Sequence, residues 1–325
     1  MCYSAQIWQD YRKYVRQFDG QLDLEAFVQL FWSRLDNDKI KIPKAMEMAF
    51  TDPLNPSEEG FKQIRAAVGI WQTQQALKLE QELFKQRARL ADAQRALQSK
   101  TTKAALEAQR ISGSKVEWIL AKLADLRRRE LQDDDSRIYP GTYAPVMVIE
   151  DGRRVLKPMR YQCRPAGKPV SYDRQYPGTY NARRDNLEGF WKRQFGHSHG
   201  LMVVNAFYEH VTRPRPTAAS TGNGHEGDGL ENVILEFRPR PQQDMLVACL
   251  WSHWRGEGES DLDSFAAITD TPPEEVAAVG HDRCIIPIKY KNMEAWLSQN
   301  PRNLSDLYAI LDDRQRPYFE HRLAA

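Results

Sequence analysis

A long segment without proline most constrains how this chain can fold. It follows the break Asp52-Pro53-Leu54-Asn55-Pro56, runs to about Arg129, and is rich in Ala, Leu, Gln, Glu, Lys and Arg. Because these residues favour helix and proline interrupts it, the segment predicts α-helix almost throughout. Ser57, followed by Glu58 and Glu59, is typical of a helix start, a capping residue followed by acids in the first turn.

Apolar residues recur every seven positions in this segment. They are Ala76, Leu83, Leu90, Leu97, Ala104 and Ile111. A second seam is weak, since Gln86 and Lys100 occupy positions that a firm coiled coil fills with apolar side chains. Ser112-Gly113-Ser114 interrupts the run, which resumes at Val116. We therefore predict a helical arm, a long helix folded back by a shorter one, that packs on its own domain rather than forming an extended dimerising coiled coil.

The remainder of the chain has a different pattern of apolar residues. The first 55 residues show apolar positions near the helical period and are predicted to be helical. After Asp133-Asp134-Asp135, short β-branched and aromatic runs between Gly and Pro predict strands at 143–149, 201–208, 233–237, 245–250, 265–269 and 284–288. Short helices are predicted at 292–299 and 304–312, and a flexible Gly-rich insertion at 218–229.

These patterns predict an α+β protein with a mostly antiparallel β core and an inserted long α-helical arm. We divide the chain into an N-terminal part of the core domain at 1–57, the arm at 58–133, and the main core at 134–325.

Composition and charge narrow the class of protein. No window approaches the roughly 18 apolar residues of a membrane span, and the N-terminus lacks the layout of a secretion signal. The four cysteines are widely spaced, which predicts neither a disulfide scaffold nor a zinc ribbon and favours a reducing, cytoplasmic location. Residues 137–200 hold 12 Lys and Arg against 5 Asp and Glu, whereas residues 201–325 hold 12 against 19. This asymmetry fits a positive groove for a phosphate backbone, or two solvated faces whose charges mix in space.

Cys2 is the first candidate for chemistry. Removal of Met1 would leave a cysteine whose free α-amine lies beside its thiol. The α-amine has an ordinary pKa of about 7.7–8.0, so a useful fraction is neutral and nucleophilic at physiological pH. Such a terminus condenses with an aldehyde to a thiazolidine, or serves as an N-terminal nucleophile in amide hydrolysis.

Three further segments carry polar groups suited to catalysis or binding. One segment is Tyr180-Asn181-Ala182-Arg183-Arg184, which follows a turn inside the basic region 137–200. The planar guanidinium groups of its two arginines are suited to bind phosphate. The apolar run from Leu201 ends at Glu209, where partial burial would raise the pKa of the carboxyl, as a general acid or base requires. Gly280-His281-Asp282-Arg283 precedes an apolar strand, and a histidine there suits proton transfer near neutral pH.

The order of these segments along the chain is more specific than any one of them. Met1-Cys2, Asn181-Ala182-Arg183, Phe207-Tyr208-Glu209 and His281-Asp282-Arg283 together resemble the SRAP family, the SOS-response-associated peptidases or abasic-site processing proteins. Further matching segments are Ala144-Pro145, Met159-Arg160-Tyr161, Leu250-Trp251 and the run 264–272. The resemblance covers Cys2 and roughly residues 138–290.

The resemblance implies a fold around a β-barrel-like core and an abasic-site sensor that crosslinks covalently to single-stranded DNA through a thiazolidine. By this resemblance Cys2 is the nucleophile and Asn181 orients the terminus. Glu209 positions the α-amine and manages its proton, and His281 assists ring opening and proton transfer. Arg183 holds the phosphate next to the lesion, and the predicted DNA contacts also include Arg160, Arg184 and Lys168. No cofactor or metal is implied.

The chain also departs from the family pattern. Tyr3-Ser4 stands where the family has Gly-Arg, His210 stands where it has Trp, and the segment 164–169 replaces a Trp-rich stretch. The helical arm is additional. We expect basic residues between Lys157 and Lys168 to supply phosphate contacts in place of those lost.

Two other functions remain open at this point. One is a cysteine peptidase, autoproteolytic or acting on another protein, that uses the same Cys and Glu. The other is a noncatalytic DNA-associated scaffold whose arm recruits a protein partner or a second copy. A metal site at His197-Ser198-His199 is disfavoured, because no third ligand with standard spacing is apparent.

Overall fold

The structure is a computed structural model that describes residues 3–214 and 230–324. Contacts between Cα atoms divide the chain into two compact units. The core unit comprises Met1–Phe27, Lys39–Ala49 and Asp133–Ala325, and the helical unit comprises Val28–Asp38 and Phe50–Gln132. The domain boundaries predicted at 57/58 and 133/134 stay a prediction. The predicted insertion at 218–229 lies outside the described residues.

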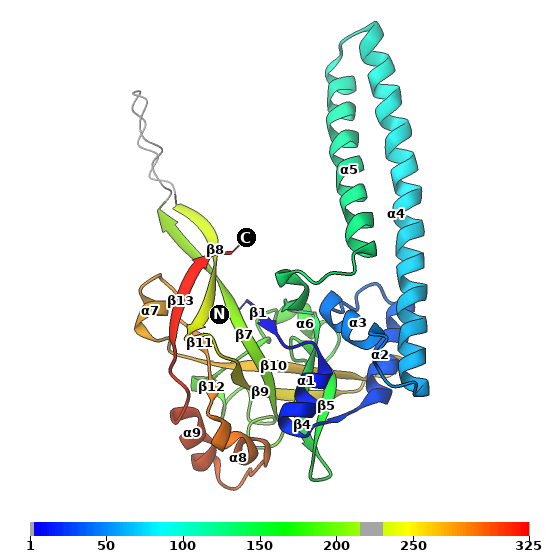
Figure 1. The fold of residues 1–325 in the computed structure, drawn as a ribbon. Helices are drawn as coiled ribbons and strands as arrows, with labels where there is room; N and C mark the ends of the chain where they lie inside the picture. Colours follow the sequence, from blue (N-terminus) through cyan, green and yellow to red (C-terminus); the bar gives the residue numbers. More distant parts are fainter. Residues whose placement is uncertain (1–2, 215–229, 325) are drawn as a thin grey trace. The chain divides into compact units, whose positions relative to one another are not determined.

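One mostly antiparallel sheet dominates the core unit, and the prediction of an α+β protein is confirmed. Among the described residues the sheet has 13 strands. They are β1 (Ser4–Ile7), β2 (Gln21–Leu22), β3 (Arg137–Ile138), β4 (Tyr143–Glu150), β5 (Arg153–Tyr161), β6 (Asn181–Arg183), β7 (His199–Pro214), β8 (Leu230–Arg240), β9 (Met245–Trp254), β10 (Leu262–Asp270), β11 (Cys284–Ile285), β12 (Pro287–Ile288) and β13 (Tyr318–Leu323). Figure 1 shows β7 and β8 as a long pair, with β13 beside β8.

Strand pairing returns on itself within this sheet. β7 pairs with β9, β9 with β10, β10 with β5, β5 with β4, and β4 again with β7. Among the strands of the described residues, β10 pairs parallel with β5 and β6, and β2 pairs parallel with β5, whereas the other strand pairs are antiparallel. The fully buried side chains of Val146, Met202, Val247 and Phe265 belong to one cluster contributed by four of these strands. The core therefore depends on residues far apart in the sequence.

The N-terminal segment differs from its prediction. Helices form over α1 (Tyr11–Phe18), α2 (Leu24–Asp36) and α3 (Lys44–Thr51), but Ser4–Ile7 is strand β1. β1 pairs antiparallel with both β7 and β3. A segment of four residues is too short for its periodicity to be read, and its conformation is imposed by the two neighbouring strands.

Short helices complete the core unit. They are α6 (Tyr172–Gln175), α7 (Glu274–Ala277), α8 (Met293–Leu297) and α9 (Leu304–Asp312). The helix predicted at 304–312 is confirmed to the residue, and α8 lies within the helix predicted at 292–299. Trp296 of α8 is fully buried, and its indole N–H donates to the Gly200 carbonyl of β7 at 3.0 Å. This bond fixes α8 on the sheet.

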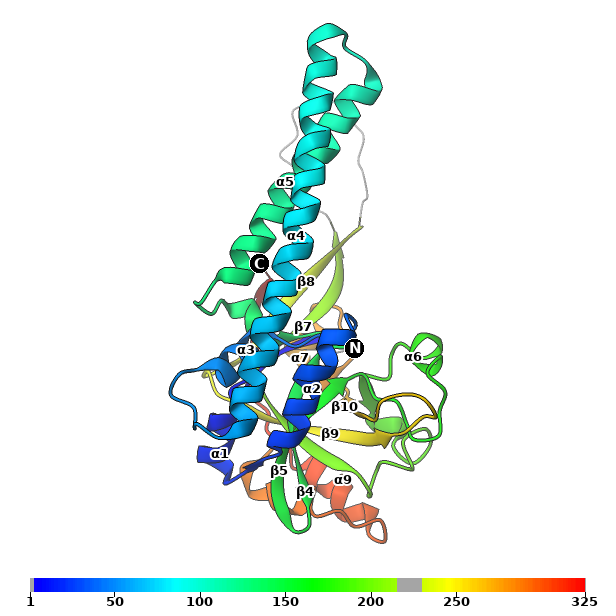
Figure 2. The ribbon, with the colours of Figure 1, turned by 90° about the vertical axis from the view of Figure 1, so that its right-hand side faces the viewer.

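The helical unit contains the predicted arm. α4 (Glu59–Ser99) and α5 (Lys103–Arg127) form an antiparallel hairpin, which Figures 1 and 2 show side by side. The apolar seam is the contact between them, since Leu83 packs with Ile119 and Leu123, and Ala76 joins the same cluster. The prediction of a long helix folded back by a shorter one is confirmed.

The ends of these helices differ from the prediction in two details. The chain turns at 100–102, where the Thr102 hydroxyl accepts the Ala105 N–H at 3.2 Å, whereas Ser112-Gly113-Ser114 lies inside α5. Threonine caps a helix by this bond, and one glycine costs a helix only about 1 kcal/mol. α4 begins at Glu59 rather than at Ser57. None of the helices in the described residues is apolar and long enough to cross a membrane.

The first turns of α4 are not part of a free-standing arm. Phe61, Ile64 and Val68 are buried within the helical unit, and the rings of Phe31, Phe50 and Phe61 are in successive contact. The base of the hairpin thus carries buried apolar side chains, and Phe61 joins a run of ring contacts with Phe50 and Phe31.

Candidate functional site

Glu209 is a fully buried carboxyl in the middle of β7. The strand was predicted to end at this residue, but it continues to Pro214, because β8 pairs with it along its whole second half. Glu209 lies opposite Leu235, and its Oε2 is 3.0 Å from Nε2 of His281. His281 is 8% exposed and lies in the loop before β11, as predicted. The structure thus joins two of the predicted catalytic residues in one buried pair.

The second ring nitrogen of His281 contacts the backbone of Arg283. Nδ1 lies 2.9 Å from the Arg283 carbonyl oxygen and 3.4 Å from the Arg283 backbone nitrogen. The 3.0 Å contact between Oε2 and Nε2 allows Glu209 and His281 to share one proton.

Burial also changes the acidity of this glutamate. Loss of hydration raises the pKa of Glu209 above its usual range, and the hydrogen bonds from His281 and the Tyr3 backbone N–H offset this only in part. A carboxyl with a raised pKa keeps its proton closer to neutral pH and can act as a general acid.

The start of the described chain lies at this carboxyl. β1 runs antiparallel to β7 with Ser4 opposite Tyr208, so the backbone of Tyr3 comes next to that of Glu209. Cys2, the predicted nucleophile, lies outside the described residues. Its sequence neighbour therefore contacts the Glu209–His281 pair.

The residues that depart from the family pattern contact one another. The ring of Tyr3 lies 4.7 Å from that of His210 and 5.8 Å from that of Tyr139, each in an edge-to-face arrangement. Arg137 donates from Nε to the Ser4 hydroxyl at 3.0 Å, and its guanidinium lies 3.6 Å from the Tyr208 ring centroid. Sequence reasoning missed Arg137 and Tyr139, because only the pairing of β3 with β1 brings them to this place.

Asn181 lies on a different strand. It begins β6, is 5% exposed, and pairs with Ala267 of β10. Its assignment as the residue that orients the chain terminus stays a prediction.

Arg183 is a predicted phosphate contact with an accessible side chain. Its guanidinium is half exposed and lies 2.7 Å from Asp185, which also lies 3.4 Å from Arg283. Asp185 therefore links Arg183 to the loop that carries His281. Arg184 is bound more firmly, because Asp312 at 2.5 Å and the ring of Tyr308 hold it.

Arg160 and Lys168 lie apart from this link. Arg160 and Arg164 share the carboxylate of Asp173, with Arg160 at 2.8 Å, and all three side chains are less than one-fifth exposed. Burial raises the pKa of Asp173, but the two arginines more than offset this and hold it below its usual range. Lys168 is exposed above the ring of Tyr172 at 5.5 Å. A phosphate at Arg160 would have to compete with Asp173, whereas Lys168 is accessible.

His199 has structural partners instead of a metal. Its Nε2 accepts the Gly196 N–H at 2.8 Å, its Nδ1 donates to the Trp296 carbonyl at 2.9 Å, and its ring stacks on Trp296. Burial lowers the pKa of His199 to about 4, so the ring stays neutral. Across residues 3–214 and 230–324, no group of three His, Cys, Asp or Glu side chains is placed to hold a metal ion.

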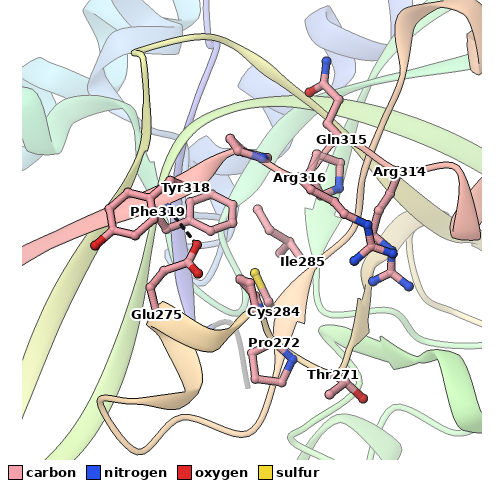
Figure 3. A pocket seen from close by; sticks show the side chains of 13 residues that line it. Thr271, Pro272, Glu275, Cys284, Ile285, Arg314, Gln315, Arg316, Tyr318 and Phe319 are labelled. Carbon is pink, nitrogen blue, oxygen red and sulfur yellow. Dashed lines mark hydrogen bonds between the residues drawn. The ribbon is translucent and has the colours of Figure 1, made fainter.

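A pocket of about 290 Å³ lies between α7, β11 and the segment that leads into β13 (Figure 3). Cys284, Arg314 and Tyr318 line it, and the Phe319 N–H donates to the Glu275 carboxylate at its edge at 2.9 Å. Burial raises the pKa of Cys284, and so does the charge of Glu209. Glu209 and His281 do not line this pocket, so it is separate from the buried pair.

Comparison with solved structures finds similar proteins of low identity, and three of them are described here. A protein from Bacteroides thetaiotaomicron is 12% identical with a TM-score of 0.46, over 60% of this chain and 80% of that one. A protein from Bordetella bronchiseptica is 15% identical with a TM-score of 0.43, over 58% and 87%. A phage-related protein from the same organism is 17% identical with a TM-score of 0.42, over 63% and 88%. No curated protein matches.

A family model matches most of the chain. The model of the SOS response associated peptidases (SRAP) matches residues 90–322, which include β3 to β12, the Glu209–His281 pair and Asn181 to Arg184. The match extends well beyond half of the sequence. Membership supports a function associated with DNA damage, and it agrees with the resemblance drawn from the order of the motifs. This chain belongs to the SRAP family.

Proposed function

We propose that the protein senses abasic sites in single-stranded DNA and crosslinks to them covalently through Cys2 after removal of Met1. The observation that carries this proposal is the buried Glu209–His281 pair in contact with the backbone of Tyr3, one residue from the proposed nucleophile. The pair supplies an exchangeable proton where the chain terminus would react. In the same proposal, the closed circuit of strands is the barrel-like core, and the protein acts in a reducing, cytoplasmic compartment.

The proposed reaction joins the α-amine and thiol of Cys2 to the aldehyde of the ring-opened sugar. The amine adds to the aldehyde carbon, and loss of one water gives an imine. The thiol sulfur then adds to the imine carbon while its proton passes to nitrogen, which closes a five-membered thiazolidine. No other group leaves.

Each of the predicted residues has a part in this scheme. The Glu209 carboxylate takes the proton from the Cys2 ammonium, and the protonated carboxyl returns it to the departing hydroxyl. His281 holds that proton in reserve and assists opening of the deoxyribose ring. Asn181 orients the terminus.

Basic residues of the core unit would contact the DNA. Arg183 holds the phosphate beside the lesion by exchanging Asp185 for it, and Lys168 contacts the strand further along. Arg160 and Arg184 complete the proposed surface, each in competition with its own carboxylate partner.

The test is crosslinking to an abasic single-stranded oligonucleotide. We expect a species stable to SDS and heat, formed by protein whose intact mass shows loss of Met1. Cys2→Ala should abolish it, and Cys2→Ser should give at best a labile imine, because an oxygen ring closes less favourably. Cys163→Ala, which removes a buried thiol, is the matched control and should retain the yield. A stable crosslink from Cys2→Ala in equal yield would refute the proposal.

The second candidate is peptidase activity, favoured by the description of the matching family. The same Cys2 and Glu209 would cleave an amide bond, for example to release a short segment placed before Cys2. A variant that cleaves such a segment but leaves abasic DNA untouched would favour this function. A noncatalytic scaffold gains support only if Cys2 proves dispensable for both activities.

A further inference from the structure

The end of the helical hairpin is strongly basic. Residues 85–122, called here the distal arm, carry nine Lys and Arg against three Asp and Glu, a balance of +6. All nine cationic side chains are exposed. They are Lys85, Arg87, Arg89, Arg95, Lys100, Lys103, Arg110, Lys115 and Lys122. The overall net charge of +2 conceals this surface.

Ion pairing separates the base of the hairpin from the distal arm. At the base, Lys62 pairs with Glu59, Lys78 with Asp38, and Arg127 with Glu80. In the distal arm, Arg95 and Arg110 have acidic partners on their own helix. Among the described residues, the seven other cations of the distal arm have no carboxylate within ion-pair distance. An ordinary solvated helix face would mix both signs as the base does.

The positions of these cations are unfavourable for the isolated helix. Lys85 and Arg89 are four residues apart on α4, a spacing at which like charges repel each other. On α5, Lys115, Trp118 and Lys122 follow the i, i+3, i+7 spacing of one face. Trp118 is 57% exposed, and the ammonium of Lys122 lies 5.9 Å from its ring centroid. An exposed aromatic ring between cations suits nucleic acid, which offers phosphates and the faces of bases.

We propose that the distal arm is a second DNA-binding surface, which holds the phosphate backbone of the strand beyond the lesion. The proposal rests on the proposed function only for the choice of DNA as the polyanion. The charge, the lack of acidic partners and the Lys-Trp-Lys face are independent of any reaction at Cys2.

The experiment measures binding of the full chain to undamaged single-stranded and duplex DNA at a series of salt concentrations. The test variant combines Lys85→Gln, Arg89→Gln, Lys115→Gln and Lys122→Gln, and glutamine keeps helix propensity. Since each phosphate contact adds about 0.7 to the salt slope for single strands, the slope should fall by about two to three units.

A matched variant separates local contacts from net charge. Lys62→Gln, Lys78→Gln, Arg110→Gln and Arg127→Gln remove four cations that are already ion-paired, and should change the slope by less than one unit. Circular dichroism should show equal helix content in both variants. An unchanged slope in the test variant, or equal losses in the two, would overturn the proposal.

Two further measurements test the choice of partner. Trp118→Ala should weaken single-stranded binding by about tenfold and duplex binding less, because base stacking needs unpaired bases. Vesicles of anionic lipid are the competing polyanion, and retention by vesicles without an effect on DNA would overturn the proposal. Because undamaged DNA is used, loss of crosslinking by Cys2→Ala and loss of salt slope by the arm variant are separate results, so either proposal can fail alone.

Discussion

At the scale of single residues, the main result is that Glu209 is stable as a buried acid because His281 accepts or supplies one proton. An isolated carboxylate at 0% exposure would pay a large desolvation cost, and the 3.0 Å contact with Nε2 offsets it. Under the proposed function, the same contact would hold a proton where the terminal amine reacts.

Glu209→Gln should change how stability depends on pH. The pKa of Glu209 is raised in the folded chain, so its contribution to stability is complete below the unfolded pKa of about 4.3 and is lost as pH rises through the folded pKa. The glutamine variant lacks this loss. We therefore expect its melting temperature relative to the parent to be higher at pH 8 than at pH 5. Glu257→Gln, at an exposed position, is the control, and an equal difference at both pH values would contradict the assignment.

Part of this site could be predicted from the sequence. The motifs singled out Glu209 and His281, and the apolar run from Leu201 placed Glu209 at the end of a strand. Their contact could not be predicted, because it depends on how β7 and the loop before β11 meet in three dimensions. The packing of Tyr3 on His210 was hidden for the same reason, since it requires the register of β1 against β7.

At the scale of elements, the sequence predicted best those helices and strands whose apolar pattern is long and whose contacts are with neighbouring segments. α4 and α5 were predictable because their seam repeats over many turns and their contacts are with each other. β5 was missed, since Arg153, Arg154, Lys157 and Arg160 interrupt its apolar residues, whereas pairing with β4, β10 and β2 makes it a strand. Central position in a sheet outweighed local composition.

Gly113→Ala should stabilise the hairpin. Gly113 lies inside α5 with a helical backbone, and an added Cβ would meet no atom within 4 Å. The expected gain is about 0.5–1 kcal/mol, from the lower conformational entropy of the unfolded chain. Thermal unfolding followed by circular dichroism is the measurement. Gly152→Ala is the control, because it has equal space but a φ of +73° and should destabilise. A lower melting temperature for Gly113→Ala would mean that this turn of α5 is under a constraint other than its own helix.

At the scale of the whole molecule, the two units contain different proportions of local contact. The helical unit is built from neighbouring helices, whereas the core unit joins segments from both ends of the sequence. The ion pair of Glu80 with Arg127 at 2.9 Å shows where the two helices of the hairpin lie abreast. The hairpin can therefore be shortened at this level while the remaining parts of α4 and α5 stay side by side.

Replacing residues 81–126 with a short Gly/Ser linker should give a folded protein that still crosslinks a short abasic oligonucleotide. The cut leaves Phe61, Ile64 and Val68 in the core at the base of the hairpin. Replacing residues 60–130 removes these side chains, and each buried aromatic or branched residue lost costs about 2–5 kcal/mol. Solubility, melting temperature and crosslink yield of the two deletions are compared with the parent. If the shorter deletion is insoluble, the distal arm contributes to folding and not only to binding.

The pairing of β1 with β7 has a consequence for the timing of synthesis. Ala5 pairs with Phe207, so β1 cannot take its place until about 200 further residues have left the ribosome. At about 5–20 residues per second this interval lasts on the order of 10–40 s. The α4–α5 hairpin needs only local contacts and can form within it, on a far shorter timescale. Until β3 follows, the first residues have no strand to pair with and are open to the aminopeptidase that removes Met1, so Met1 can be removed before the sheet is assembled.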